Sequence, residues 1–87
     1  MKLKMLAMKD LKSNVYEKPF CVRTVADGIR AFEGVANDGN TQIGQFPADF
    51  ALYVIGDYDD EKGLLTSISH ESLGTASDFI KQQPTGE

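Results

Sequence analysis

Phe50-Ala51-Leu52-Tyr53-Val54-Ile55 is the stretch of sequence that decides the fold. It reads as a strand with apolar side chains on both faces. Such a strand is typical of the centre of a sheet, or of a position covered on both sides. Just before it, Pro47-Ala48-Asp49 predicts a single helical turn. Just after it, residues 57–63 are rich in Asp and Gly and predict a hairpin loop.

The C-terminal part continues from this hairpin. Leu64, Thr66 and Ile68 are spaced two residues apart and predict one face of a returning strand. A short helix is predicted to begin after Ser72, and residues 82–87 are expected to form a flexible tail. The predicted apolar side of that short helix consists of Leu73, Ala76, Phe79 and Ile80.

The N-terminal part predicts a second hairpin. Residues 1–8 alternate like a strand, with Leu3, Met5 and Ala7 on one face. Residues 10–14 form a polar turn, and residues 15–23 return as a second strand. Because Pro19 has no backbone N–H, this strand should lie on an edge or start at Phe20.

One main helix is predicted between the two hairpins, over residues 24–37. Thr24 is a typical N-cap, with Asp27 three residues later. Val25, Ile29 and Phe32 recur at helical spacing. Gly28 weakens the helix by about 1 kcal/mol relative to Ala. Residues 41–46 are left as a loop.

These elements predict an α+β fold with one domain over residues 1–81. Its expected architecture is a small antiparallel four-stranded sheet in the order β-β-α-β-β along the chain, with the main helix on one face and a short C-terminal helix. A chain of 87 residues is too short for a second core. The pattern leaves the order of strands within the sheet open.

The sequence carries no catalytic or metal-binding motif, and we expect neither an enzyme nor a cofactor. The acidic residues of 57–61 resemble the start of a calcium loop, but Ile68 stands where a bidentate Glu is required. His70 is expected on the surface and Cys21 as a small buried residue. A single Cys fits a reducing compartment. Without a continuous apolar segment we expect a soluble protein that does not contact a membrane.

Charge is divided unevenly along the chain. Residues 1–30 carry seven basic and three acidic side chains, whereas residues 31–87 carry two basic and ten acidic ones. Basic and aromatic side chains together are the types that bind single-stranded nucleic acid, although an overall pI near 4.8 opposes this interpretation. A solvated basic surface and a nucleic-acid surface both remain open. The candidate nucleic-acid-binding residues are Lys2, Lys4, Lys12, Tyr16, Lys18, Phe20, Arg23 and Arg30.

The chain resembles the small non-structural protein of gokushovirus-type microviruses, which are bacteriophages with single-stranded DNA genomes. The resemblance runs from Met1 to about Phe79, and Leu11 departs from it. Its most specific stretch is residues 46–52. It is also carried by Met1-Lys2-Leu3, Asp10, Lys12, Pro19-Phe20, Thr24, Arg30-Ala31-Phe32, Asn37, Ile55-Gly56-Asp57-Tyr58-Asp59, Gly63, Leu73-Gly74, Ala76 and Phe79.

The resemblance implies a phage protein that is made in the cytoplasm of the host bacterium and is absent from the mature virion. Such proteins look like counterparts of the microvirus C protein, which is linked to the switch from duplex replication to single-strand synthesis and packaging, and many are labelled DNA-binding. No catalytic residue is carried over.

Two functional hypotheses follow. In the first, the protein is an accessory factor of viral DNA replication and packaging that binds single-stranded DNA, with the basic candidates on phosphates and Tyr16 or Phe20 stacked on a base. In the second, it is an interaction module for the phage replication initiator, a host replication factor or the procapsid, without DNA contact. The two-sided apolar strand 50–55 also suggests a homodimer.

Overall fold

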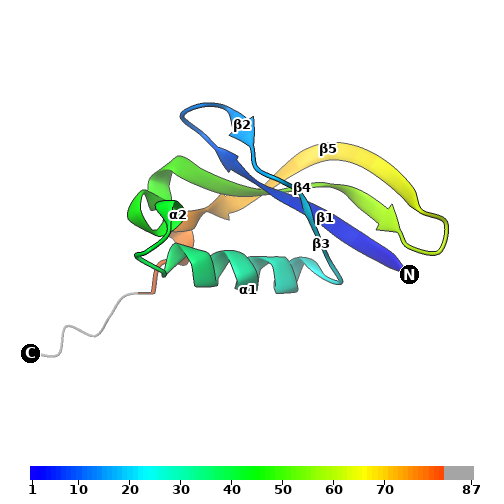
Figure 1. The fold of residues 1–87 in the computed structure, drawn as a ribbon, viewed down its shortest axis with the longest axis horizontal. Coiled ribbons are helices and arrows are strands. Elements are labelled where there is room, and N and C mark those ends of the chain that lie inside the picture. Colours follow the sequence, from blue (N-terminus) through cyan, green and yellow to red (C-terminus); the bar gives the residue numbers. More distant parts are fainter. Residues whose placement is uncertain (82–87) are drawn as a thin grey trace, which may run out of the picture.

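In the computed structural model, which describes residues 1–81, one long helix packs against a curled antiparallel sheet (Figure 1). The flexible tail predicted for residues 82–87 lies outside the described residues. The elements in chain order are β1 (Lys2–Asp10), β2 (Val15–Tyr16), β3 (Phe20–Val22), α1 (Val25–Ala36), α2 (Gln42–Gln45), the 3-10 turn η1 (Pro47–Asp49), β4 (Phe50–Asp59), β5 (Leu64–Thr75) and the 3-10 turn η2 (Ala76–Phe79).

The sheet has the order β2-β1-β4-β5, and β3 also pairs with β1. β4 lies between β1 and β5, so the central position predicted for residues 50–55 is confirmed. The strand is longer than predicted and reaches Asp59, which shortens the hairpin loop to residues 60–63. All pairings are antiparallel, as predicted.

The predicted second strand, residues 15–23, is interrupted. β2 and β3 share the edge next to β1, and Pro19 lies in the gap between them. Because proline cannot donate to β1, the strand stops and starts again at Phe20. The expected four-stranded sheet therefore has five strands.

The main helix α1 forms as predicted. Thr24 is its N-cap and accepts a hydrogen bond on Oγ1 from the Asp27 amide at 3.2 Å, and Asn37 is its C-cap. Gly28, Phe32 and Ala36 form its buried face. A side chain at Gly28 would run into Leu6 of β1, so the missing side chain allows helix and sheet to approach closely.

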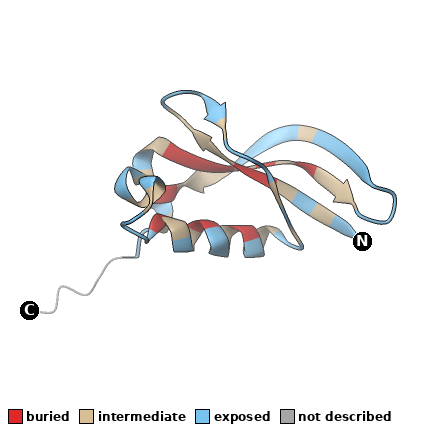
Figure 2. Ribbon diagram, viewed as in Figure 1, coloured by how far each residue is buried: buried red, intermediate tan, exposed pale blue. Residues whose placement is uncertain are grey.

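The core lies between α1 and the sheet. Leu6, Phe32 and Leu52 are completely buried in it. The ring of Phe79 packs edge-on against Phe32 at 5.8 Å between centroids, which joins η2 to α1. Buried residues follow the first half of β4 and one side of α1, whereas β5 is mostly exposed (Figure 2).

The prediction of a C-terminal helix beginning after Ser72 is wrong about where the helical segment starts and about its type. β5 runs to Thr75, and only one 3-10 turn follows, from Ala76 to Phe79. Gly74 adopts φ 121°, a conformation that interrupts a helix, and Thr75 then forms a capping box with Asp78. Residues 41–46, left as a loop, contain the short helix α2 capped by Thr41.

Cys21 is exposed, not buried as expected. Phe20 and Val22 on either side of it pack against the core, so alternation along β3 turns Cys21 to the opposite side.

Candidate nucleic-acid interface

The sheet face opposite α1, which we call the open face, carries the tyrosines of the chain. In the β1 ladder Leu3 pairs with Tyr58, Ala7 with Tyr53, and Lys9 with Tyr16. Directly paired residues share a face, and alternate residues of β1 share a face as well. Tyr16, Tyr53 and Tyr58, which are all three tyrosines of the chain, therefore belong to one face.

A β-bulge makes this arrangement possible. Residues 53 and 58 are an odd number of positions apart, so in a regular strand they would point to opposite faces. The β1–β4 register shifts between Met5 and Leu6, which leaves Ile55 without a partner in β1. One unpaired residue restores the alternation and brings both tyrosines to the open face.

Three aromatic rings meet on the open face. The ring of Tyr16 packs edge-on against Tyr53 at 5.6 Å and against His70 at 5.1 Å between centroids. The hydroxyl of Tyr16 also lies 2.9 Å from Nδ1 of His70. These rings come from β2, β4 and β5.

The contact between Tyr16 and His70 joins the two sides of the sheet. β2 and β5 are separated in the sheet by β1 and β4. Side chains of such distant strands meet only because the sheet curls, and β2 and β5 rise on the same side of the sheet, away from α1 (Figure 1). Ala7, which lies on the open face beneath the rings, is consequently 0% exposed.

A lysine completes the group. The Lys9 ammonium lies 5.1 Å from the centroid of the Tyr16 ring and 5.9 Å from that of Tyr53. Both distances are in the range of cation–π attraction. We call Lys9, Tyr16, Tyr53 and His70 the open-face cluster. It presents aromatic surface and one positive charge in the same place.

The two aromatic candidates for nucleic-acid binding, Tyr16 and Phe20, lie on opposite faces of the sheet. Tyr16 belongs to the open-face cluster. Phe20 pairs with Leu6 and packs against the core on the α1 side. The ring of Phe20 is therefore part of the core packing, whereas the ring of Tyr16 packs against Tyr53 and His70 on the open face.

The basic candidates are distributed over the molecule. Lys4 forms an ion pair with Asp57 at 3.1 Å, and Lys2 pairs in the sheet with Asp59. Both lie near the acidic β4–β5 hairpin. The others are exposed at separate places: Lys12 in the β1–β2 turn, Lys18 between β2 and β3, Arg23 before α1 and Arg30 on α1.

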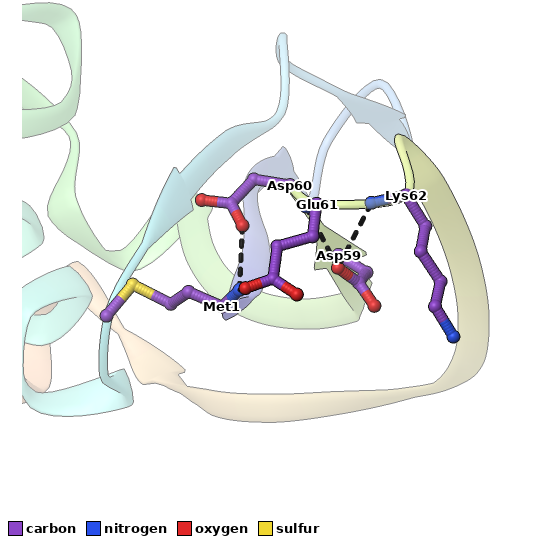
Figure 3. A network of polar contacts seen from close by, with 5 residues as sticks. All are labelled: Met1, Asp59, Asp60, Glu61 and Lys62. Atoms are coloured by element: carbon purple, nitrogen blue, oxygen red, sulfur yellow. Dashed lines mark hydrogen bonds and ion pairs between the residues drawn. The ribbon is translucent and has the colours of Figure 1, made fainter.

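Acidic side chains at the tip of the β4–β5 hairpin form hydrogen bonds and ion pairs with other groups of the same chain (Figure 3). The Met1 α-amino group lies 2.8 Å from Asp60 and 3.4 Å from Glu61. The Asp59 carboxylate accepts the backbone amides of Glu61 and Lys62. The hydrogen bond to Asp60 is the main cause that raises the pKa of the α-amino group, with further contributions from the charges of Asp60 and Asp59 and from Glu61.

A shallow groove of about 250 Å³ lies at the other end of the sheet. Phe46 is 53% exposed there. The groove is lined by Asp10, Lys12, Gln42, Phe46, Asp49 and Phe50. It places one candidate, Lys12, beside an exposed aromatic ring.

Reasoning from the sequence missed three members of the open-face cluster. Lys9, Tyr53 and His70 are not among the candidates, and the candidate Lys2 and Lys4 lie elsewhere. The available signal was the pairing of β1 with β4, which sets Lys9 and Tyr53 on one face. Strand order and the bulge at Ile55 were needed to recognise it.

Fold and site together define a small α+β domain, with a helix on one sheet face and an aromatic, lysine-bearing cluster on the other. The chain belongs to the Phage ORF5 protein family, whose model matches residues 3–79. No curated protein and no solved structure matches the chain. None of the helices within residues 1–81 has the length and apolar character needed to cross a membrane.

Proposed function

We propose that this phage protein is a non-enzymatic, non-structural accessory factor that binds single-stranded DNA through the open-face cluster. The proposal places it with the gokushovirus-type proteins that the sequence resembles, acting in the host cytoplasm at the switch between viral DNA replication and packaging. The observation that carries the proposal is the meeting of Lys9, Tyr16, Tyr53 and His70 on a sheet face that α1 leaves uncovered.

The chemistry of the cluster suits unpaired nucleotides. Every base has a flat π-face that stacks on aromatic rings, whatever its sequence. Tyr16 and Tyr53 supply such rings, and Lys9 supplies a charge for the adjoining phosphate. Lys12 and Lys18 are exposed in the segments that precede and follow β2 along the chain. A local group of this kind acts within a Debye length of about 8–10 Å, so the overall charge of −4 does not prevent binding.

Fluorescence anisotropy with a labelled single-stranded oligonucleotide tests the proposal. We expect Tyr53→Ala to weaken binding roughly 5- to 150-fold, because loss of one stacked base costs about 1–3 kcal/mol. Lys9→Gln should weaken binding and also reduce the dependence of affinity on salt, by a slope of about 0.7 for one phosphate on a single strand.

Arg30→Gln is the matched control. Arg30 is exposed on α1, on the other side of the sheet, and should leave both affinity and salt dependence nearly unchanged. Equal losses for Arg30→Gln and Lys9→Gln would instead favour the dispersed basic surface. Absence of binding at low salt and micromolar protein would refute the proposal altogether.

A further inference from the structure

The shallow groove at the end of the sheet has walls that backbone hydrogen bonds hold together. The amide of Leu11, in the β1–β2 turn, donates to the carbonyl oxygen of Asp49 in η1 at 2.8 Å. The amide of Phe46 donates to the carbonyl oxygen of Gln42 in α2 at 3.0 Å. The carbonyl oxygen of Phe46 accepts the amide of Asp49, also at 3.0 Å. The turn, α2 and η1 therefore form one connected frame around the groove.

Phe46 gives the groove an exposed aromatic surface. The residue is 53% exposed, although both of its backbone polar groups are bonded and Pro47 follows it. Because the backbone at Phe46 is already ordered, a flat ligand that stacks on the ring costs less conformational freedom. Aromatic side chains are the usual stacking surface for an unpaired base.

Two partly buried carboxylates, those of Asp10 and Asp49, line the same groove. Oδ1 of Asp10 accepts the amides of Lys12 at 3.0 Å and Ser13 at 3.4 Å, which holds that carboxylate in the turn. Among residues 1–81, the carboxylate of Asp49 takes part in no hydrogen bond or ion pair. It can therefore accept hydrogen bonds from N–H groups of a ligand.

The charges of the groove favour a nucleotide over a basic peptide. Lys12 is exposed, whereas Asp10 and Asp49 are partly buried, so the positive charge is the outer one. A basic side chain that approached the carboxylates would be repelled by Lys12. A nucleotide instead places its base against Phe46 and the carboxylates and its phosphate near Lys12. The volume of about 250 Å³ suits a single base.

We propose that this groove holds one base of the bound single-stranded DNA and prefers cytosine to thymine. The inference rests on the proposed function and adds a base preference to it. Cytosine presents an amino group, a hydrogen-bond donor, where thymine presents an oxygen, an acceptor. The amino group donates to the carboxylate of Asp49, whereas the oxygen of thymine faces that carboxylate as a second acceptor.

The groove and the open-face cluster are adjacent along β1. Lys9 belongs to the cluster, and the next residue, Asp10, lines the groove. Because neighbouring residues of a strand point to opposite faces, DNA bound at both places passes around the β1–β2 turn. Lys12 is exposed in that turn and supplies a positive charge on this route.

Fluorescence anisotropy with labelled oligo-dC and oligo-dT of equal length tests the preference. We expect the wild-type chain to bind oligo-dC roughly 5- to 150-fold more tightly, which is the discrimination of one good contact between a side chain and a base edge. Asp49→Asn should largely abolish this preference, because an amide can also donate to the thymine oxygen. Asp27→Asn, an exposed position in the first turn of α1, is the matched control and should keep the preference.

Variants at two places separate this inference from the proposed function. Tyr53→Ala, in the open-face cluster, should weaken the binding of both oligonucleotides and preserve their ratio. Phe46→Ala should weaken oligo-dC binding, whereas Leu64→Ala, at a residue that is 55% exposed in the β4–β5 hairpin, should not. Absence of binding to either oligonucleotide would refute the proposed function. Equal affinities for the two oligonucleotides, or full oligo-dC affinity in Phe46→Ala, would overturn the base preference alone.

The mononucleotide dCMP locates the site on the wild-type chain. In NMR titrations at millimolar concentration, we expect dCMP to shift the amide resonances of residues 10–12 and 42–50, and dTMP to shift them less. Shifts confined to the open-face cluster would overturn the proposal. So would shifts of the groove resonances by an arginine-containing peptide but not by dCMP, a result that would assign the groove to a basic protein partner.

Discussion

Asn37 shows how one exposed side chain holds two parts of the chain together. Its Nδ2 donates to the carbonyl oxygens of Glu33 at 2.8 Å and Phe79 at 2.9 Å. Its Oδ1 accepts the amide of Lys81 at 2.8 Å. The side chain thus ends α1 and also fixes the segment after η2, which explains why the short 3-10 turn stays against the helix.

We therefore expect Asn37→Ala to reduce the free energy of unfolding by about 1–2 kcal/mol, because each lost bond contributes about 0.5–1.5 kcal/mol. Urea denaturation measures the change. Asn40→Ala is the control, since the Asn40 contact to Asp38 is made by its backbone amide. Equal stabilities of the two variants would contradict the role assigned to Asn37.

The α-amino group of Met1 provides a prediction about pH. Its pKa is raised, mainly by the hydrogen bond to Asp60. Because the pKa is raised in the folded state, the interaction stabilises the fold fully at pH values below the ordinary pKa near 8.0. This stabilisation is lost as the pH rises through the higher pKa of the folded chain. Asp60→Asn should lower the pKa toward its ordinary value, as followed by NMR titration of Met1. Asp38→Asn, far along the chain, should leave it unchanged.

At the scale of the element, β4 depends on Gly56. This residue follows the bulge at Ile55, and a Cβ there would lie 2.5 Å from the backbone oxygen of Thr66 in β5. Gly56→Ala should reduce the free energy of unfolding by about 1–3 kcal/mol, because the backbone of a paired strand must move.

Gly34→Ala is the matched control in a thermal or urea denaturation experiment. No atom lies within 4 Å of a Cβ at Gly34, in the exposed part of α1. The added methyl group should stabilise the helix by up to about 1 kcal/mol. We expect changes of opposite sign in the free energy of unfolding for Gly56→Ala and Gly34→Ala. Destabilisation of the same size in both variants would show that the close approach of Gly56 to β5 does not limit the residue at that position.

Local signals predicted the elements that depend on local chemistry. Thr24 and Asn37 marked the ends of α1, and Pro19 marked the break at the sheet edge. The error at the C-terminus has a tertiary cause. Leu73 and Ala76 are compatible with a helical apolar face, but β4 offers unpaired backbone groups as far as Ala51, and β5 continues to Thr75 to pair with them.

The site was predictable only in part for a related reason. Tyr16 was identified because a basic and aromatic segment is visible in the sequence itself. Tyr53 and His70 join it through strand order and through shifts in register around Ile55, which no local pattern encodes. A strand period of two residues assigns faces correctly only until the first bulge.

At the scale of the whole molecule, the uneven charge along the chain does not become two separate charged halves. Lys4 pairs with Asp57, and the Met1 α-amino group pairs with Asp60. The basic N-terminal strand thus runs antiparallel to the acidic end of β4, and the two charges compensate each other in the ladder. Among residues 1–81, Lys9 near β2 takes part in none of these ion pairs, and its ammonium group lies over the tyrosine rings.

The curl of the sheet is itself open to test, because one hydrogen bond joins its two sides. Tyr16→Phe removes the hydroxyl that lies 2.9 Å from His70 Nδ1 but keeps the ring. The loss of about 0.5–1.5 kcal/mol should accelerate amide exchange in β2 and around His70 by roughly two- to thirteenfold, since these segments open locally. Exchange in α1 should not change, because its buried face contacts the opposite side of the sheet.

Tyr58→Phe is the control for this experiment, since it removes the same atom from the same face. Within residues 1–81, no hydrogen bond in the structure involves the Tyr58 hydroxyl, and β2 should retain its protection in that variant. If exchange in β2 is equally fast in both variants, the Tyr16–His70 contact does not hold the curl. The packing of the rings over Ala7 would then be the feature that shapes the open face.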